Sequence, residues 1–353
     1  MHDALAAILP AVDRALPRVR LGEWPTPIEP LALRDALWVK REDLSSPLYG
    51  GNKVRCLEPV IAALEGQGAR RIWATGAWGS NQAVAIAAHG ARRGLATGAL
   101  LFPQPAGAAA ADNLRALMAT DCAVRLLPSI ALFPLSVAGL RLRGEAVIPP
   151  GAAVPRGALG HLTAALEVAE SVAAGALPAP RHVVLAVGST CTTAGLLVGF
   201  AAAARLGVGF TAPPVVHAVR VTPWPVTARR RIVGLALATA RLLAQLGGPD
   251  VADRRALAAG LTVSGAELGR GYGHPTASGR AAIAAFAAAG GPRLDPTYAG
   301  KSGAWLRAHL DRLDGPTLFW ATKSAALPPR ADDAALAGRV SPRVMRWLDA
   351  GRA

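Results

Sequence analysis

The chain is poor in cysteine for its length. Its 353 residues contain three cysteines, Cys56, Cys122 and Cys191, which lie far apart and form no CxxC pair. An odd number at such wide spacing argues against a disulfide framework. The seven histidines form no HExxH motif or similar cluster, so the spacing of residues along the chain predicts no bound metal ion.

Long apolar runs are also missing. The best candidate for a bilayer span, residues 183–210, is interrupted by hydroxyl-bearing side chains between Ser189 and Thr193. The first residues include Asp3 and Asp13 and lack the basic start of a signal peptide. We therefore expect a soluble cytoplasmic protein with no membrane partner.

Lysine is scarce although the chain is basic. The formal net charge is +15, yet only four of the 38 basic residues are lysines: Lys40, Lys53, Lys301 and Lys323. The arginines are scattered, and no zinc-finger spacing, basic-zipper heptad or RNP-like aromatic run accompanies them, so we expect no nucleic-acid partner. Arginine cannot form an imine. The few lysines are therefore the candidates for a reactive amine.

What the chain does have is alternation of apolar strand-like segments with alanine-rich helical ones. Strands are predicted over 37–40, 71–75, 97–102, 123–127, 182–187, 215–221 and 317–321. Helices are predicted over 53–65, 80–93, 109–119, 157–173, 226–246, 277–289 and 303–313, and from the loop 188–193 to residue 204. Residues 129–156 are predicted to be irregular. This order indicates an α/β fold with parallel sheets, in which sites lie beyond the carboxyl ends of strands.

Two loops at such positions carry polar side chains. The first ends in Gly50-Gly51-Asn52 and leads into a helix at Lys53. Its glycines permit a sharp turn and leave room for a flat ligand, although an isolated lysine at a helix start is usually an ordinary surface residue. The second contains Ser80, Asn81 and Gln82 at the start of an apolar helix. Helix capping explains Ser80 alone, so the other two side chains are candidates for ligand contacts.

A third loop follows an apolar strand and opens another helix. It reads Gly188-Ser189-Thr190-Cys191-Thr192-Thr193-Ala194-Gly195. Backbone N–H groups and hydroxyls at a helix start can cradle a phosphate. The loop has neither the GK[ST] of a Walker A motif nor GxGxxG, which argues against a nucleotide or dinucleotide site. A plain Ser/Thr-rich turn is the alternative.

The three loops together supply an amine, polar side chains for a ring and a phosphate cradle, which are the groups that pyridoxal phosphate (PLP) requires. With them, the chain resembles the fold-type II PLP enzymes, in the branch of D-cysteine desulfhydrase and 1-aminocyclopropane-1-carboxylate (ACC) deaminase. The matching stretches follow the family's order over nearly the whole chain: Thr26-Pro27, residues 40–43, 50–55, 80–82 and 188–195, Gly271-Tyr272-Gly273, and residues 294–301.

The resemblance implies where the cofactor, pyridoxal 5'-phosphate, would bind. Lys53 would hold it as a Schiff base and move the Cα proton of the substrate. Asn81 would contact the ring hydroxyl, and the hydroxyl of Thr322 would face the pyridine nitrogen. The phosphate would be held by the loop of Gly188, Ser189, Thr190, Cys191, Thr192 and Thr193.

The resemblance also implies the substrate side of the site. Ser80, Asn81 and Gln82 would contact the substrate, and Tyr272 and Tyr298 would line the same space. The catalytic set would be Lys53, Ser80, Tyr272 and Tyr298.

A neutral hydroxyl at the pyridine nitrogen favours a lyase. Unlike a carboxylate, such a hydroxyl does not keep the nitrogen protonated, so reactions in which a leaving group takes the electrons are favoured. The leading expectation is α,β-elimination from a small amino acid such as D-cysteine, which gives pyruvate and ammonia. General-base help of this kind contributes about 10²–10⁴-fold.

The sequence departs from the family at several of these positions. Residue 299 is alanine where ACC deaminases carry glutamate, which argues against ACC ring opening. Lys323 follows Thr322 in place of glycine, Thr190 and Cys191 stand in a loop that is usually richer in glycine, and Cys56 replaces a lysine. The alternatives are an ACC deaminase-like ring opening, an amino-acid racemase, and a PLP-binding protein without turnover.

The resemblance implies a two-domain, tryptophan synthase β-like architecture with open, parallel-rich sheets flanked by helices. The length allows roughly two domains. We expect a large PLP-binding domain from residues 1–45 plus 151–353 and a small domain from residues 46–150. The expected partners are a small amino-acid substrate and a second copy of the chain in a homodimer.

Overall fold

The larger of two sheets has six strands and contains segments from both ends of the chain. In a computed structural model, which describes residues 3–326 and 328–352, the strand order is β1-β2-β10-β7-β8-β9. The neighbours pair in parallel, except that β1 runs antiparallel to β2. The strand bounds are Ile28–Pro30 (β1), Leu37–Arg41 (β2), Thr317–Ala321 (β10), His182–Val187 (β7), Val215–Arg220 (β8) and Leu261–Ser264 (β9).

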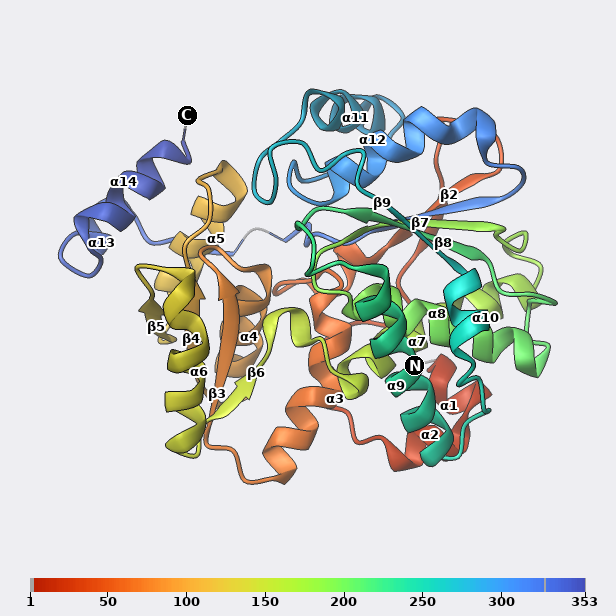
Figure 1. Cartoon of the computed structure of the whole chain (residues 1–353), viewed down its shortest axis with the longest axis horizontal. Coiled ribbons are helices and arrows are strands. Elements are labelled where there is room, and N and C mark those ends of the chain that lie inside the picture. Colours follow the sequence, from red (N-terminus) through yellow and green to blue (C-terminus); the bar gives the residue numbers. More distant parts are fainter. Residues whose placement is uncertain (1–2, 327, 353) are drawn as a thin grey trace.

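The smaller sheet is wholly parallel and is built from one continuous stretch of chain. Its order is β5-β4-β3-β6. The bounds are Ala123–Leu126 (β5), Ala96–Phe102 (β4), Arg71–Ala77 (β3) and Ala146–Ile148 (β6). The two sheets lie side by side with helices between them (Figure 1). The fold is therefore α/β with parallel-rich sheets, as the sequence predicts.

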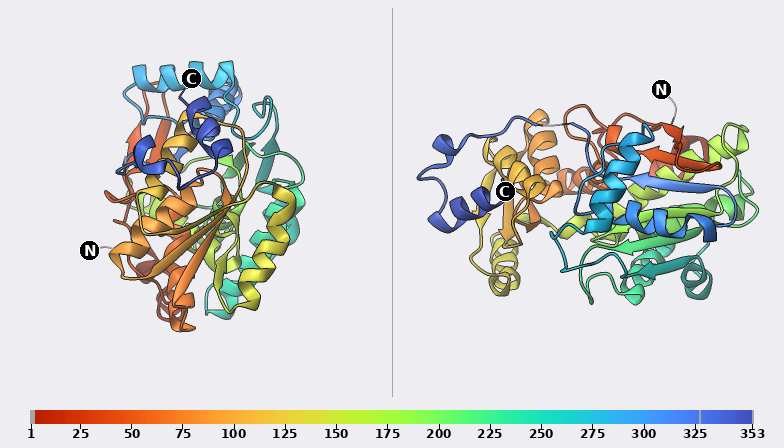
Figure 2. Two further views of the ribbon diagram at one scale, coloured as in Figure 1. Left: turned by 90° about the vertical axis from the view of Figure 1, so that its left-hand side faces the viewer. Right: turned by 90° about the horizontal axis from the view of Figure 1, so that it is seen from above.

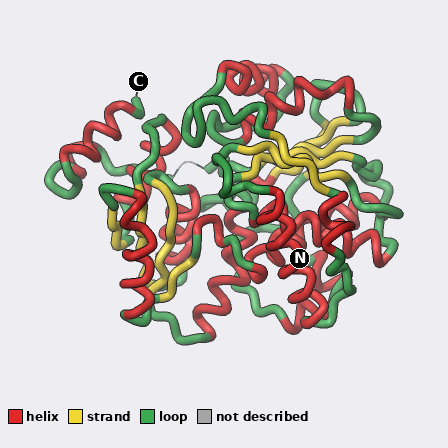
Figure 3. Tube along the Cα trace, viewed as in Figure 1, coloured by secondary structure: helices red, strands yellow, loops and turns green. Residues whose placement is uncertain are grey.

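Helices cover both faces of each sheet. Figures 1 and 3 show α11 and α12 on one face of the larger sheet and α7 to α10 on the other. Around the smaller sheet, α4 and α5 lie on one face and α6 on the other (Figure 2). The bounds are Ala4–Ile8 (α1), Pro10–Ala15 (α2), Lys53–Gly66 (α3), Asn81–Arg92 (α4), Ala108–Met118 (α5), Phe133–Leu142 (α6), Pro155–Ala173 (α7), Cys191–Leu206 (α8), Arg229–Gln245 (α9), Arg254–Ala259 (α10), Ala277–Ala288 (α11) and Ala299–His309 (α12).

The last segment of the chain returns to the smaller sheet. Helices α13 (Asp333–Leu336) and α14 (Pro342–Ala350) lie beside α5 (Figure 1). Arg115 of α5 forms an ion pair with Asp333, and the rings of Trp78 and Trp347 meet edge to face with centroids 5.5 Å apart. Apart from this C-terminal segment, each predicted domain contains the strands of one sheet. The division into two domains stays a prediction. Among the described residues, no helix is long and apolar enough to cross a membrane.

The prediction for residues 129–156 is wrong. This stretch contains α6 and the short strand β6, which pairs with β3. Pro134 lies at the start of α6, where the missing N–H costs no intrahelical hydrogen bond, so proline there begins a helix instead of breaking one. The prediction that the helix after Tyr298 begins at residue 303 is also shifted, because α12 begins at Ala299.

A buried network of four charged side chains holds α3 against the larger sheet. Lys40 and Glu42, from the end of β2 and the turn after it, meet Arg55 of α3 and Glu167 of α7. Arg55 donates to both carboxylates at 2.6–2.8 Å, and Lys40 Nζ lies 2.6 Å from Glu167 Oε2. Two positive and two negative charges balance, as buried charges require. The network fixes the helix that begins at Lys53.

Candidate active site

Lys53 is the first residue of α3, and the loop before it is fastened to the end of β10. The N–H of Asn52 donates to the carbonyl of Thr322 at 3.0 Å. Gly51 has a φ of +87°, and a Cβ atom there would lie 2.7 Å from the same carbonyl oxygen, so only glycine fits both the conformation and the space. The loop thus places the start of α3, with Lys53 as its first residue, beside Thr322 at the carboxyl end of β10.

The loop after β7 reaches α8 and has the features of a phosphate cradle. Helix α8 begins at Cys191, inside the predicted loop 188–193, so the N–H groups of its first turn have no partner within the helix. The Oγ1 atom of Thr193 is buried and has no hydrogen-bond partner among the described residues. Thr190 has a φ of +75°, a left-handed conformation that is unusual for a β-branched residue.

This loop is joined directly to the loop of Lys53. The Nδ2 atom of Asn52 donates to Thr192 Oγ1 at 2.8 Å, and Thr192 Oγ1 lies 3.3 Å from His161 Nε2. Residues 140 positions apart in sequence therefore meet at the site.

The polar side chains at the start of α4 have different hydrogen-bonding partners. Ser80 is the N-cap of α4 and accepts a hydrogen bond from the N–H of Ala83 at 3.4 Å. Gln82 is buried and donates through Nε2 to the carbonyl of Pro149 at 3.0 Å, while its Oε1 atom has no partner among the described residues. The N-terminal end of α4 thus presents an unpaired amide oxygen besides the cap.

Asn81 belongs to a hydrogen-bonded network that the sequence did not predict. Its Oδ1 atom lies 2.9 Å from the hydroxyl of Tyr49 and accepts from Asn113 Nδ2 at 2.8 Å. Lys323 Nζ donates to the same hydroxyl at 3.1 Å and to Asn113 Oδ1 at 3.2 Å. Because Oδ1 takes these bonds, the amide N–H groups of Asn81 are left to donate to a ligand, as far as the described part of the chain shows. Burial lowers the pKa of Lys323.

Tyr49 and Asn113 could have been noticed in the sequence. Tyr49 is one of only three tyrosines and lies in the turn-rich loop before Lys53, and Asn113 is an uncharged polar residue in an alanine-rich helix. Nothing in their spacing, however, indicates that the two side chains would meet Lys323.

Tyr272 and Tyr298 form a pair of hydroxyls next to the phosphate loop. Their hydroxyl oxygens lie 2.5 Å apart and their rings meet edge to face. A Cβ atom on Gly188 would lie 3.1 Å from the Tyr298 ring, which places this tyrosine against the cradle. Burial raises the pKa of Tyr272 and raises that of Tyr298 well above 10. Both hydroxyls are therefore protonated at neutral pH.

Asp295 and Lys301 hold these tyrosines. The carboxylate of Asp295 accepts from the N–H groups of Thr297, Tyr298 and Ala299 at 2.7–3.0 Å and so satisfies backbone donors at the start of α12. Lys301 Nζ donates to the carbonyls of Leu268 and Gly271 at 2.8 and 3.0 Å. Lys301 thus supports the loop that carries Tyr272.

Three residues that the sequence separates widely meet behind the cradle. Cys56, His161 and Cys191 are all buried, and their potential ligand atoms lie within 4.8 Å of one another. A hydrogen bond with the Cys191 thiol lowers the pKa of Cys56, whereas burial raises the pKa of Cys191. The expectation of no metal cluster considered spacing along the chain alone, and it missed this group.

The residues present fit PLP. The hydroxyl of Thr193, at the start of α8, is buried and has no hydrogen-bond partner among the described residues. A phosphate oxygen bound at this helix start would supply the missing partner. Lys53 lies beside this cradle through the Asn52–Thr192 contact, and Asn81 presents a fixed amide. Lys53, Asn81, Thr322 and the residues of the loop 188–193 would hold the cofactor.

Comparisons with known proteins agree with this site. The model of the family described as "Pyridoxal-phosphate dependent enzyme" matches residues 19–322. The nocardicin C-9' epimerase of Nocardia uniformis subsp. tsuyamanensis is 41% identical over 201 residues, and the D-cysteine desulfhydrase of Salmonella paratyphi C (strain RKS4594) is 32% identical over 202 residues. These alignments cover 53% and 52% of this chain and 60% of the length of each relative.

Solved structures agree as well. The crystal structure of an ACC deaminase homologue superposes with a TM-score of 0.74 at 26% sequence identity, covering 93% of this chain and 96% of that one. The predicted family, fold and cofactor are thus confirmed. The chain belongs to the pyridoxal-phosphate dependent enzymes, has their fold-type II architecture and uses pyridoxal 5'-phosphate as its cofactor.

Proposed function

We propose that the protein removes the Cα proton of an amino-acid substrate and supplies a proton to the opposite face of the same carbon, as an epimerase or racemase. The observation that carries the proposal is a protonated hydroxyl pair, Tyr272–Tyr298, which packs against Gly188 of the phosphate loop. Asn52, the residue before Lys53, is hydrogen-bonded to Thr192 of the same loop. Inverting a carbon centre requires a base that takes the proton and an acid that supplies one. The 41% identity to an epimerase supports this reading over an eliminating enzyme at 32%.

Each residue has a defined task in this proposal. When bound, the cofactor withdraws electrons from the Cα carbon of the substrate. Lys53 takes the Cα proton on its amine nitrogen. The Tyr298 hydroxyl, kept protonated by burial and hydrogen-bonded to Tyr272, supplies a proton to the carbon. Ser80, Asn81 and Gln82 orient the substrate, and Thr193 with the rest of the loop anchors the phosphate.

β-Elimination is the second candidate. Lys53 would take the same proton, and a β-substituent would then leave with the bonding electrons, giving pyruvate and ammonia after hydrolysis. The similarity to D-cysteine desulfhydrases favours it, as does the neutral Thr322 at the end of β10. ACC ring opening is disfavoured, because the buried Ala299 offers no functional group. A protein that binds PLP without turnover remains the alternative from another class.

One experiment separates these reactions. The purified holoprotein is incubated in deuterated water with D- and L-amino acids and, because of the relative's name, a nocardicin. Loss of the Cα–H signal in the NMR spectrum with inversion of configuration supports the epimerase. Pyruvate release without inversion supports elimination. A cofactor absorbance band with neither outcome supports binding alone.

Two variants test the assigned roles. Lys53→Ala should abolish both Cα exchange and the cofactor band that depends on the amine. Tyr298→Phe should keep the band and slow inversion by about 10²-fold or more. Exchange that continues unchanged in Tyr298→Phe would contradict the assigned acid. The homodimer and the cytoplasmic location stay predictions, and sedimentation velocity tests the first.

A further inference from the structure

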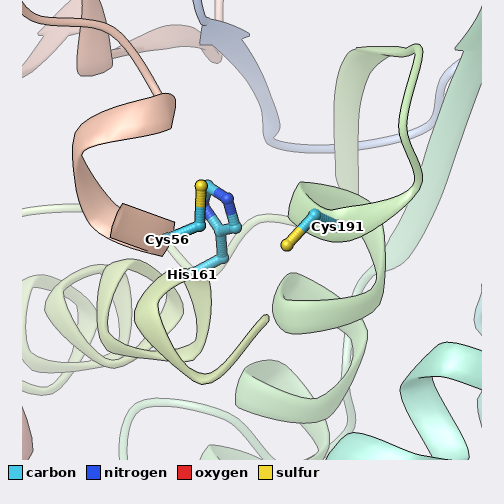
Figure 4. Close-up of side chains that lie close together, drawn as sticks. All are labelled: Cys56, His161 and Cys191. Atoms are coloured by element: carbon cyan, nitrogen blue, oxygen red, sulfur yellow. The ribbon is translucent and has the colours of Figure 1, made fainter. Parts of the chain in front are cut away.

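We infer that Cys56, His161 and Cys191 form a binding site for a thiophilic divalent metal ion, Zn²⁺, directly behind the cofactor site. Figure 4 shows the three side chains turned toward a common space from α3, α7 and α8. The site does not depend on the proposed reaction, because Cys56 and His161 take no part in it and Cys191 serves there only as a member of the phosphate loop.

The geometry is close to that of a zinc site. All three side chains are 0% exposed, and their ligand atoms lie within 4.8 Å of one another. Zinc binds cysteine sulfur at about 2.3 Å and histidine nitrogen at about 2.0–2.1 Å, so two donors on one tetrahedral ion lie about 3.5–4 Å apart. Small side-chain rotations therefore suffice to bring the three atoms onto one ion.

The imidazole of His161 gives a second, independent indication of a metal site. Its Nδ1 atom is buried and has no hydrogen-bond partner in the described part of the chain, whereas Nε2 lies 3.3 Å from Thr192 Oγ1. A buried ring nitrogen without a partner is costly. Metal-binding histidines commonly use one nitrogen for the metal and the other for a hydrogen bond that orients the ring, which is the arrangement that a ligand at Nδ1 would complete.

Charge and softness favour zinc over other common cations. Two thiolates and one Zn²⁺ sum to zero, so the filled site adds no net charge to a buried region. Mg²⁺ and Ca²⁺ prefer oxygen ligands and are disfavoured by a two-sulfur set. Without an ion, Cys56 Sγ lies 3.1 Å from the carbonyl of Lys53 and Cys191 Sγ lies 3.1 Å from that of Ala152. These thiol contacts would be exchanged for metal bonds.

The position of the site gives it a structural consequence. Cys56 lies one helical turn after Lys53, and Cys191 is the first residue of α8 and belongs to the phosphate loop. A bound ion would tie together the three helices α3, α7 and α8 at the point where two of them carry the cofactor residues. Three protein ligands leave a fourth position for water.

Cobalt is the probe for the test. Co²⁺ is titrated into the reduced, PLP-free chain, and sulfur-to-cobalt charge-transfer absorption is followed together with the visible bands of tetrahedral cobalt. We expect saturation at one ion per chain and loss of the bands on addition of Zn²⁺. Cys56→Ser, Cys191→Ser and His161→Ala should each lose them. The matched control, Cys122→Ser, removes the remaining cysteine, which lies outside the cluster, and should keep them.

Two further measurements keep the inference open to refutation. Lys53→Ala should retain the cobalt bands while losing the cofactor band, so failure of the metal site and failure of the proposed function are distinguishable. X-ray absorption of the unmodified zinc-loaded chain should give two sulfur neighbours, whatever the folding of the variants. A folded, reduced chain without charge-transfer bands, bands that persist in Cys56→Ser, or a zinc shell without sulfur would each overturn the inference.

Discussion

The Nδ2 atom of Asn52 donates a hydrogen bond to Thr192 Oγ1 at 2.8 Å. This contact joins the residue before Lys53 to the loop that would hold the phosphate. It links the start of α3 to the first turn of α8. The pair therefore contributes to the alignment of Lys53 with the phosphate cradle, together with the hydrogen bond from the Asn52 N–H to the Thr322 carbonyl.

Removing this pair should weaken cofactor binding. Asn52→Ala deletes the donor, and a neutral hydrogen bond contributes about 0.5–1.5 kcal/mol, so we expect the Kd for PLP to rise about 2- to 13-fold. Absorbance titration with PLP measures the change. Thr192→Ser keeps the hydroxyl and serves as the control. A Kd in Asn52→Ala equal to that of the unmodified chain would show that the contact does not align the site.

The buried charge network should dominate the stability of α3. Arg55→Ala leaves Glu42 and Glu167 buried without their main partner, and breaking a buried pair in this way costs about 3–5 kcal/mol. Urea unfolding followed by circular dichroism measures the loss. Arg93→Ala breaks the partly exposed pair with Glu65 and should cost less than about 1 kcal/mol. Similar losses in the two variants would contradict the assigned role of the network.

Thr190 holds a strained backbone in the phosphate loop. Its φ of +75° is unfavourable for a β-branched side chain. Thr190→Gly should relieve the strain and, after the entropy cost of glycine, stabilise the chain by about 1 kcal/mol. Thermal unfolding measures the effect, and Thr190→Ala, which keeps a Cβ atom, should gain much less. A destabilised Thr190→Gly variant would mean that the threonine side chain makes a contact worth more than the strain.

Stability should fall in mild acid because of His217. Burial and the neighbouring His182 lower the pKa of His217 to about 4, against 6.5 for an unperturbed histidine. Between these values the unfolded chain binds a proton that the folded chain does not. This group's contribution is therefore constant above pH 6.5 and is lost as the pH falls from 6.5 toward 4, by about 1–3 kcal/mol after allowance for solvent screening.

Urea unfolding at a series of pH values measures this slope. His217→Gln should flatten the pH dependence in the window below 6.5, because the group that titrates is gone. An equally steep curve in His217→Gln would assign the acid sensitivity to other groups.

Much of the architecture followed from local patterns. Apolar runs bounded by turn residues predicted the strands 182–187 and 317–321 with the bounds that the structure has. Alanine-rich periodic segments predicted most helices to within a few residues. Such patterns work because alternation and helical spacing report directly on which face of a segment is buried. The start of α12 was missed, because its N-cap position is Tyr298, which is not a capping residue type, and the carboxylate that binds the N–H of Ala299 comes from Asp295, four positions before the helix.

The sequence alone determined the fold class and the cofactor, because Gly50 to Lys53 and the loop 188–195 are contiguous motifs whose backbone chemistry is local, while Lys53 as the reactive amine stays a prediction. Tertiary structure alone decided which distant side chains meet. Lys323 reaches Asn81 through Tyr49, and Cys56 and Cys191 share a buried space with His161. No spacing rule reports such encounters, since they depend on how the sheets and helices close over more than a hundred residues of chain.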